Sequence, residues 1–162
     1  VEREADGREP LVRCINFGLD GMQSFSFTLE EERSAVLVPA GQVGTYLYEP
    51  NASVLKAGAF KQIAVRTGVK KLQVNSHLYT ADHLVSDFPG RRFRVDEVLS
   101  FTGKLCKGLS KTIPQANITV RNFPLSVEEL RKRTKITDGG HVYLFATTLV
   151  DGEKVLVKCS KA

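Results

Sequence analysis

The sequence lacks paired cysteines and long apolar runs. Its three cysteines, Cys14, Cys106 and Cys159, are far apart in 162 residues and form no CxxC motif. A scattered, odd-numbered set argues against a disulfide framework or a zinc site and fits a reducing cytoplasm. No apolar run approaches the ~18 residues that a membrane span needs. The polar start VEREADGREP predicts no signal peptide, and a first residue other than Met is typical of a piece of a longer protein. We therefore expect a cytoplasmic chain without a membrane segment.

Motifs of common enzyme classes are also missing. The sequence contains no P-loop, no GxGxxG after a strand, no GxSxG and no HExxH. His77 and His83 are six residues apart with Asp82 between them, but nothing in the sequence supports a complete set of three ligands with the geometry that a metal ion requires. The paired carboxylates in EEER and VEEL are interpreted as a solvated loop and a helix cap, respectively. We predict no catalytic, cofactor or metal site in this chain.

Positive charge is concentrated in the second half of the sequence. Residues 1–90 carry 9 Lys and Arg against 11 Asp and Glu, a net charge of −2. Residues 91–162 carry 14 against 7, a net charge of +7. A basic segment joined to a nearly neutral one favours a polyanionic partner such as RNA or DNA, although a solubilising surface gives the same pattern.

The first 45 residues are predicted to be β-rich. The apolar segments LVRCINF and QSFSFTL flank Asp20-Gly21, which predicts a β-hairpin. SAVLVP predicts a third strand after an acidic loop, EEER. Three short strands bury too little surface to be stable alone, so we expect them to pack against another part of the protein.

The middle segment predicts one helix followed by two strands. Asn51 is a typical N-cap, Gly68 a typical C-terminal stop, and apolar residues recur every four positions between them. Gly58 inside this helix indicates close backbone packing. LQV and HLYTA are predicted strands, and Phe88-Pro89-Gly90 predicts a domain boundary.

The last 72 residues predict the order β-α-β-α-β-β. RRFRVDEVLSF reads as a strand with Phe93, Val95 and Glu97 on one face, and TGKLCKGLSKTI as a short helix. Ser126 and Glu129 form a capping box for a second helix. Asp151-Gly152 predicts a two-residue hairpin between the last two strands. The fold class is therefore α+β, with small mixed sheets and helices packed on them.

Three groups of polar residues are the candidate nucleic-acid contacts. The planar guanidinium group of arginine can donate two hydrogen bonds to phosphate oxygens, and an asparagine side chain can bind a base edge or a sugar. Phe123 is a candidate for base stacking, although a turn phenylalanine before proline is more typical of a core. Basic residues at a helix end also favour the helix dipole, so a purely structural role stays open. The candidates are Arg91, Arg92, Arg94, Arg121, Asn122, Arg131, Lys132, Arg133 and Lys135.

Long stretches of the sequence resemble one protein family. YLYEPNASVLKAGAF, NSHLYTADHLVSDFPGR and ITVRNFPLSVEELRKR…GGHVYLFATT are similar to the C-terminal region of bacterial class I S-adenosylmethionine-dependent methyltransferases. The resemblance implies a ferredoxin-like segment over residues 46–90 and a THUMP-like domain over residues 91–162. It also implies that residues 1–45 are the last strands of a methyltransferase domain, which would account for their small buried surface.

The resemblance implies RNA as the substrate and S-adenosylmethionine as the cofactor of the parent chain. The Gly-rich turn that admits this cofactor is missing here, and Glu49-Pro50-Asn51 only partly matches the Asn/Asp-Pro-Pro-Tyr-like loop of amino-methylating members. We therefore expect an RNA-recognition region that is not catalytic in isolation, with the missing catalytic domain and RNA as partners. The alternative is a structural or dimerisation module, including a homodimer, without RNA contact.

Overall fold

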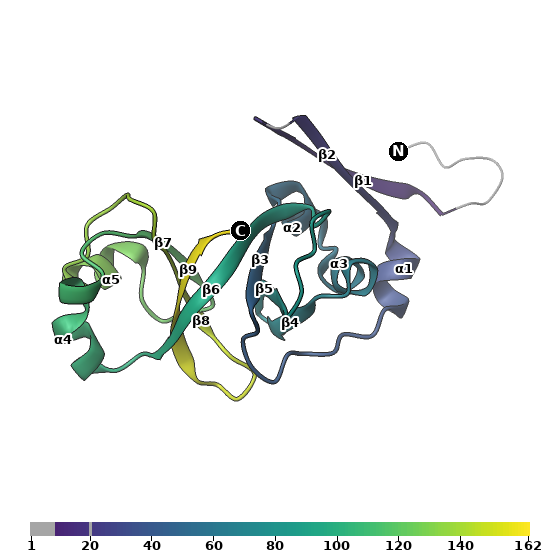
Figure 1. Ribbon diagram of the computed structural model, residues 1–162. Helices are drawn as coiled ribbons and strands as arrows, with labels where there is room; N and C mark the ends of the chain where they lie inside the picture. Colours follow the sequence, from purple (N-terminus) through teal and green to yellow (C-terminus); the bar gives the residue numbers. More distant parts are fainter. Residues whose placement is uncertain (1–8, 20) are drawn as a thin grey trace.

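A seven-stranded mixed sheet forms the centre of the molecule (Figure 1). We describe a computed structural model, which covers residues 9–19 and 21–162. The strand order is β4-β5-β3-β6-β9-β8-β7, antiparallel throughout except for the parallel pair β7–β8. The predicted sheets of residues 46–162 are thus joined into one, residues 11–28 form a separate two-stranded sheet, and the α+β class is confirmed. The strands of this sheet are β3 (Tyr46–Pro50), β4 (Lys70–Gln73), β5 (Ser76–Ala81), β6 (Gly90–Ser100), β7 (Asn117–Arg121), β8 (Tyr143–Thr148) and β9 (Lys154–Lys161).

The sheet bends so that its two outer strands approach each other at one end. The amide of Asn122, which follows β7, donates to Ser76 Oγ at 3.1 Å, at the start of β5. The Ser76 hydroxyl in turn donates to the carbonyl of Thr148, which ends β8, at 2.8 Å. Inside this bend lies a core of side chains from most of the strands, among them Leu47, Phe93 and Phe145. The two halves of the chain therefore share one apolar core.

Two separate layers cover the outer face of the sheet. The first contains α2 (Ala52–Ala57), α3 (Phe60–Thr67) and the hairpin of β1 (Leu11–Gly18) and β2 (Gly21–Thr28). The second contains α4 (Gly103–Thr112) and α5 (Val127–Thr134), which pack on β7, β8 and β9. Figure 1 shows these layers at opposite ends of the molecule. No helix in the described ranges is long and apolar enough to cross a membrane.

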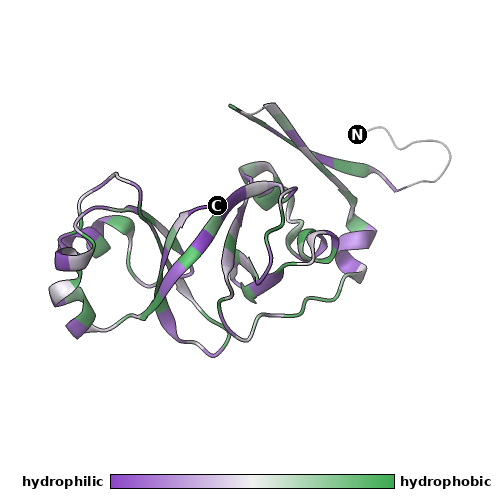
Figure 2. Ribbon diagram, in the orientation of Figure 1, coloured by the Kyte–Doolittle hydropathy of each residue, from purple (hydrophilic) through white to green (hydrophobic). Residues whose placement is uncertain are grey.

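Local capping signals explain both a confirmed and a wrong prediction. The predicted capping box of Ser126 and Glu129 is present at the start of α5. Thr28 and Glu31 form a second one, which turns the predicted acidic loop into α1 (Leu29–Ser34), a hydrophilic helix (Figure 2). The predicted third strand is also wrong, since residues 35–38 form no strand and Pro39 makes only an isolated bridge to Lys71.

The predicted helix from Asn51 to Gly68 is two helices. Gly58 has a φ of 75°, a left-handed conformation that ends α2, and its Cβ position faces open space, so the predicted close packing there is wrong. Gly68, with a φ of 78°, ends α3 as predicted. Asn51 is the N-cap residue of α2, but its side chain donates to Gln23 Oε1 instead of capping the helix.

Three strand details differ from or add to the predictions. The β8–β9 hairpin is confirmed, but its connection spans residues 149–153 and is longer than the predicted two. A bulge between Val95 and Glu97 breaks the alternation of β6, so Glu97 is exposed instead of sharing the face of Phe93. The β1–β2 hairpin is confirmed, while Asp20 of its predicted turn lies outside the described residues.

Candidate nucleic-acid interface

Arg91 and Arg121 share one carboxylate between the two halves of the chain. Glu49 on β3 is 8% exposed, and its Oε1 accepts from Arg91 Nη2 at 2.7 Å and Nε at 3.0 Å. Its Oε2 accepts from Arg121 Nη2 at 3.4 Å. Both arginines were predicted phosphate ligands, and the structure engages both in fixing a buried acid. Part of their charge is therefore neutralised within the protein.

Asn122 also has a structural role. Its φ of 56° is left-handed, a conformation that asparagine tolerates better than most residues. Its amide donates to Gln73 Oε1 and to Ser76 Oγ, both at 3.1 Å, which ties the end of β7 to the β4–β5 turn. The next residue, Phe123, packs edge-to-face on Phe101 with the ring centroids 4.9 Å apart, in the core beneath α4 and α5. The core interpretation of this phenylalanine is confirmed.

Arg131 is anchored at the opposite end of β7. Its guanidinium donates to the carbonyls of Ala116 at 3.1 Å and Ile136 at 3.3 Å, and pairs with Asp138 at 2.9 Å. These bonds fix the loop that follows α5 against the start of β7. Arg131 therefore holds backbone, whereas its neighbours Lys132 and Arg133 are exposed and form no ion pair within the described ranges.

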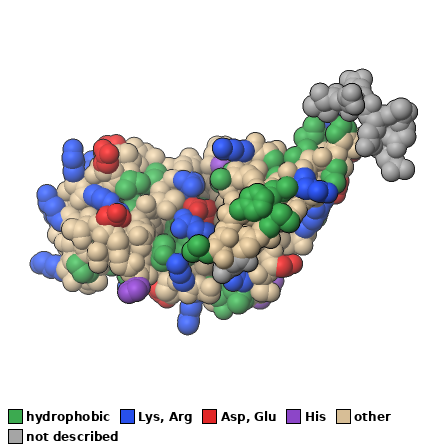
Figure 3. Space-filling view, turned by 90° about the horizontal axis from the view of Figure 1, so that it is seen from above, with side chains coloured by type: hydrophobic (Ala, Val, Ile, Leu, Met, Phe, Trp, Pro, Cys, Tyr) green, Lys and Arg blue, Asp and Glu red, His purple; other side chains and the backbone are tan. Residues whose placement is uncertain are grey.

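The residues predicted to contact nucleic acid lie in more than one part of the structure. Arg121 and Asn122 end β7, while α5 runs back along that strand, so Lys132, Arg133 and Lys135 lie near its beginning. A five-residue strand separates the two ends by about 13 Å. Arg92 and Arg94 lie on the middle strand β6, where Arg92 donates to the carbonyl of Ser86 at 2.8 Å. Figure 3 shows Lys and Arg side chains spread over one face, with acidic side chains between some of them.

The densest positive charge lies on the α4–α5 pair. Helix α4 contains three lysines and no acidic residue. Helix α5 with its C-cap Lys135 contains four basic and two acidic residues, so the pair has the same net charge, +5, as the whole chain. In Figure 3 this end of the molecule, on the left, carries several Lys and Arg side chains. We call this surface the basic helix pair, defined by Lys104, Lys107, Lys111, Lys132, Arg133 and Lys135.

The sequence interpretation missed the lysines of α4, although a signal was present. Lys104, Lys107 and Lys111 recur at spacings of three and four, which places them along one side of a helix. Lys104 also lies in the first turn, where the helix dipole disfavours a positive charge. Burial raises the pKa of the Cys106 thiol on α4, and the nearby charge of Arg133 on α5 opposes this rise. The two helices thus bring their cations onto neighbouring surfaces.

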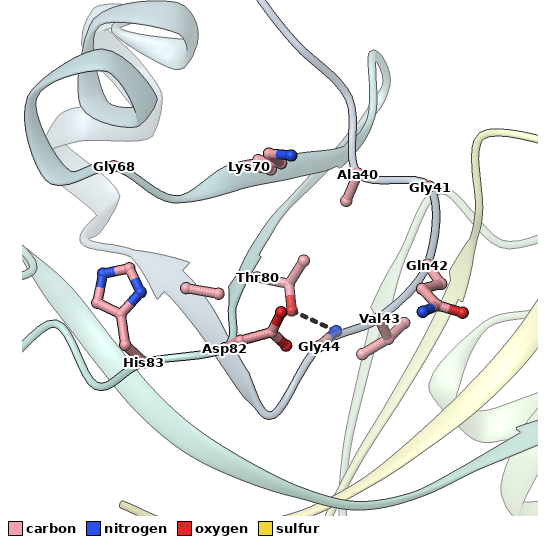
Figure 4. Close-up of a pocket in the computed structure, with 11 residues that line it drawn as sticks. Ala40, Gly41, Gln42, Val43, Gly44, Gly68, Lys70, Thr80, Asp82 and His83 are labelled. Carbon is pink, nitrogen blue, oxygen red and sulfur yellow. Dashed lines mark hydrogen bonds between the residues drawn. The ribbon is translucent and has the colours of Figure 1, made fainter.

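A cleft with both polar and apolar lining residues lies at the other end of the molecule. It has a volume of about 660 Å³ and runs between the loop of residues 40–44 and β5 (Figure 4). The Gly44 N–H donates to Thr80 Oγ1 at 2.8 Å, and Asp82 faces Gly44, while His83 lies toward Gly68. His77 does not line this cleft, because its ring stacks on Phe60 at 4.1 Å. Within the described residues, no three His, Cys, Asp or Glu side chains are placed to hold a metal ion.

A buried lysine lies close to His77. Lys71 is 1% exposed, and its Nζ donates to the Val74 carbonyl at 2.6 Å and lies 4.9 Å from the Phe60 ring centroid. Burial lowers the pKa of Lys71 to about 8, with the Glu32 carboxylate acting in the opposite direction. Burial also lowers the pKa of His77, and the charge of Lys71 adds to that effect. Burial therefore disfavours the charged forms of both Lys71 and His77.

The destabilising effect of the buried Lys71 is expected to become smaller in alkaline solution. The ammonium loses its proton near pH 8 when folded but near pH 10.5 when unfolded, so between these values the unfolded chain binds more protons. The contribution of this residue to the free energy of unfolding therefore rises with pH in that window. We expect Lys71→Met to raise this free energy at pH 7 by about 2 kcal/mol. Urea unfolding of both proteins at pH 7 and pH 10 measures the difference in free energy of unfolding between the variant and the wild-type chain. If this difference is not smaller at pH 10 than at pH 7, the lowered pKa of Lys71 is contradicted.

Two family models match adjacent parts of the chain. Residues 46–89 match a ferredoxin-like domain, and residues 90–161 match a THUMP domain-like family. None of the curated proteins compared matches the chain. A crystal structure named "putative methyltransferase from Porphyromonas gingivalis W83" is similar, with a TM-score of 0.90 and 47% sequence identity. The match covers 94% of this chain and 38% of that protein, so this chain spans less than half of its length.

Proposed function

We propose that this chain is the RNA-recognition region of a methyltransferase. The chain carries a ferredoxin-like and a THUMP-like domain, and the THUMP-like match includes all of α4 and α5. The observation that carries the proposal is the basic helix pair, because α4 and α5 together with Lys135 have a net charge of +5, equal to that of the whole chain. Structural bonds do not explain this charge, because Lys104, Lys107, Lys111, Lys132, Arg133 and Lys135 form no ion pair within the described ranges. A phosphate backbone is the ligand that such a surface fits best.

Methyl transfer itself is assigned to residues outside this sequence. The similar protein from Porphyromonas gingivalis is named a "putative methyltransferase" and is more than twice as long as this chain. Within the described residues, β3 leads through Asn51 directly into α2, without the Gly-rich turn that S-adenosylmethionine binding by the class I fold needs. The residues present therefore do not fit this cofactor. We propose that a class I catalytic domain elsewhere in the protein binds it.

A cytoplasmic location is part of the same proposal. The three cysteines are free and buried, and burial raises the pKa of Cys159 to about 12. Buried thiols with raised pKa values are unreactive, and free thiols are typical of a reducing compartment. This setting agrees with an enzyme that acts on cellular RNA.

RNA binding is expected to be strongly salt-dependent. If the basic helix pair neutralises three to five phosphates, the logarithm of the affinity for single-stranded RNA should fall against the logarithm of salt concentration with a slope of about −2 to −4. Fluorescence anisotropy of the full chain with a labelled RNA oligonucleotide at several salt concentrations measures this slope. Binding that does not respond to salt, or no binding at low salt, would refute the proposal.

The alternative function is that of a structural or dimerisation module. It is favoured by the apolar side chains on the β1–β2 hairpin, since Phe17 is 81% and Met22 61% exposed. Exposed apolar groups of this kind are typical of surfaces that pack against another domain or a second copy. If the chain fails to bind RNA at low salt and sediments as a clean dimer, this alternative replaces the RNA-recognition proposal.

A further inference from the structure

An open cavity lies along α4, on the basic helix pair. Its volume is about 480 Å³, which is within the range of small-ligand sites. Its wall combines the half-buried Leu105 and the buried Leu109 with the exposed Lys104, Gly108 and Thr112. Ser100 and Thr102 close the end next to β6. The cavity therefore has an apolar floor and a rim that includes a positive charge.

Gly108 is the feature that opens this cavity. A Cβ atom built at Gly108 would meet no atom within 4 Å, so neither packing nor a left-handed backbone requires glycine there. A glycine inside a helix costs about 1 kcal/mol relative to alanine. The fold thus carries a destabilising residue whose only local effect is to leave the helix backbone uncovered. Flat groups can approach the helix at this point more closely than at any side chain.

The three lysines of α4 lie beside the cavity. With about 100° between successive residues of a helix, Lys107, Lys111 and Lys104 occupy about 60° of its surface. The next 60° or so are occupied by Gly108, Thr112 and Leu105, which line the cavity. The acidic Glu153 accepts from Ser100 Oγ at 2.5 Å, at the β6 end of the cavity. A phosphate chain is thereby favoured along the lysine edge and disfavoured near Ser100.

We infer that this cavity receives one unstacked base of a single-stranded RNA segment, whose phosphates lie on Lys104, Lys107 and Lys111. Single-stranded RNA is recognised through splayed bases that pack on protein side chains, most often aromatic ones, together with cations along the backbone. In this cavity the packing surface is Leu105, Leu109 and the uncovered backbone at Gly108. An apolar pocket with Lys104 on its rim, and with Lys107 and Lys111 on the adjoining side of the same helix, provides both parts. The inference rests on the proposed RNA-recognition function and extends it, because it predicts that single strands are bound more tightly than duplexes.

Gly108→Leu tests this inference without weakening the fold. Leucine is a better helix former than glycine by close to 1 kcal/mol, so the variant should melt no lower than the wild-type chain. Its side chain fills the space above Gly108 and excludes the base. Because the base can then no longer bury its surface against Leu105 and Leu109, the affinity for a labelled single-stranded RNA oligonucleotide should fall about tenfold, which corresponds to about 1.4 kcal/mol. The affinity for a blunt RNA duplex should stay within about twofold, since its phosphates still meet the lysines.

Gly103→Leu is the matched control. Gly103 lies on the same helix, a Cβ atom there also meets nothing within 4 Å, and it does not line the cavity. This variant should bind single strands as the wild-type chain does. Suppose that the wild-type chain binds single-stranded RNA. If Gly108→Leu binds it equally well, or if this variant loses affinity for single strands and duplexes alike, the cavity is not a base site although the proposed function stands. If the wild-type chain binds neither, both proposals fail.

Discussion

Reversing three charges on the basic helix pair is expected to lower the affinity for single-stranded RNA at least about a hundredfold at low salt. The variant combines Lys107→Glu, Lys111→Glu and Lys132→Glu. All three side chains are exposed, and they form no ion pair within the described ranges. Each lost phosphate contact should reduce the salt slope for single-stranded RNA by about 0.7, so the expected slope of about −2 to −4 should become shallower by about 2.

This choice of residues follows from the contacts of the predicted arginines. Arg91 and Arg121 bind Glu49, and Arg131 binds the carbonyls of Ala116 and Ile136. Replacing any of them would disturb the fold as well as the charge, so a loss of RNA binding would have two explanations. The exposed lysines avoid this ambiguity, because surface substitutions away from such contacts usually change stability by less than about 0.5 kcal/mol.

A control variant separates local from overall charge. Arg13→Glu, Lys56→Glu and Lys70→Glu change the net charge by the same amount, and all three residues are exposed on elements outside the THUMP-like match. This variant should keep most of its affinity for RNA. Equal losses in the two variants would mean that the chain attracts RNA by its overall charge and that the basic helix pair is not its binding surface.

Much of the fold could be predicted because its signals are local. The capping box of Ser126 and Glu129, the left-handed stop at Gly68 and the hairpin around Asp151-Gly152 each depend on residues only a few positions apart. The order β-α-β-α-β-β of the last part of the chain follows from such signals and is confirmed. The missed helix α1 had a signal of the same kind, because Thr28 and Glu31 are three residues apart, and the run of acids concealed it.

The partners of the candidate residues could not be predicted, because they are far away in the sequence. Glu49 meets Arg121 across 72 positions, and Asn122 meets Ser76 across 46. These contacts exist only because the sheet bends and brings its outer strands together. The sequence showed which residues suit phosphate, and the fold determined which of them are left available to bind it. The lysines of α4 are the opposite case, since their spacing was readable without any long-range information.

Replacing Gly90 by alanine is expected to remove most of the stability of the chain. Gly90 begins β6 and pairs with Pro50 at the end of β3. A Cβ atom there would overlap the Glu49 carbonyl oxygen and lie 2.8 Å from Pro50 Cα, and both are backbone atoms that cannot rotate away. The strands would have to separate, which costs pairing and core contacts together. We expect a loss of at least about 4 kcal/mol in the free energy of unfolding, against a usual total of about 5–15 kcal/mol.

This prediction concerns function because Gly90 lies between the two domains. It lies where the ferredoxin-like match ends and the THUMP-like match begins, next to the carboxylate that holds Arg91 and Arg121. Separation of β3 from β6 would break the sheet between the two domains.

Because the sequence has no tryptophan, unfolding in urea is best followed by far-UV circular dichroism. Gly41→Ala is the control, since its Cβ meets nothing within 4 Å and should change stability by less than about 0.5 kcal/mol. Wild-type stability in Gly90→Ala would mean that β3 and β6 do not approach this closely, and that the two domains are joined in another way.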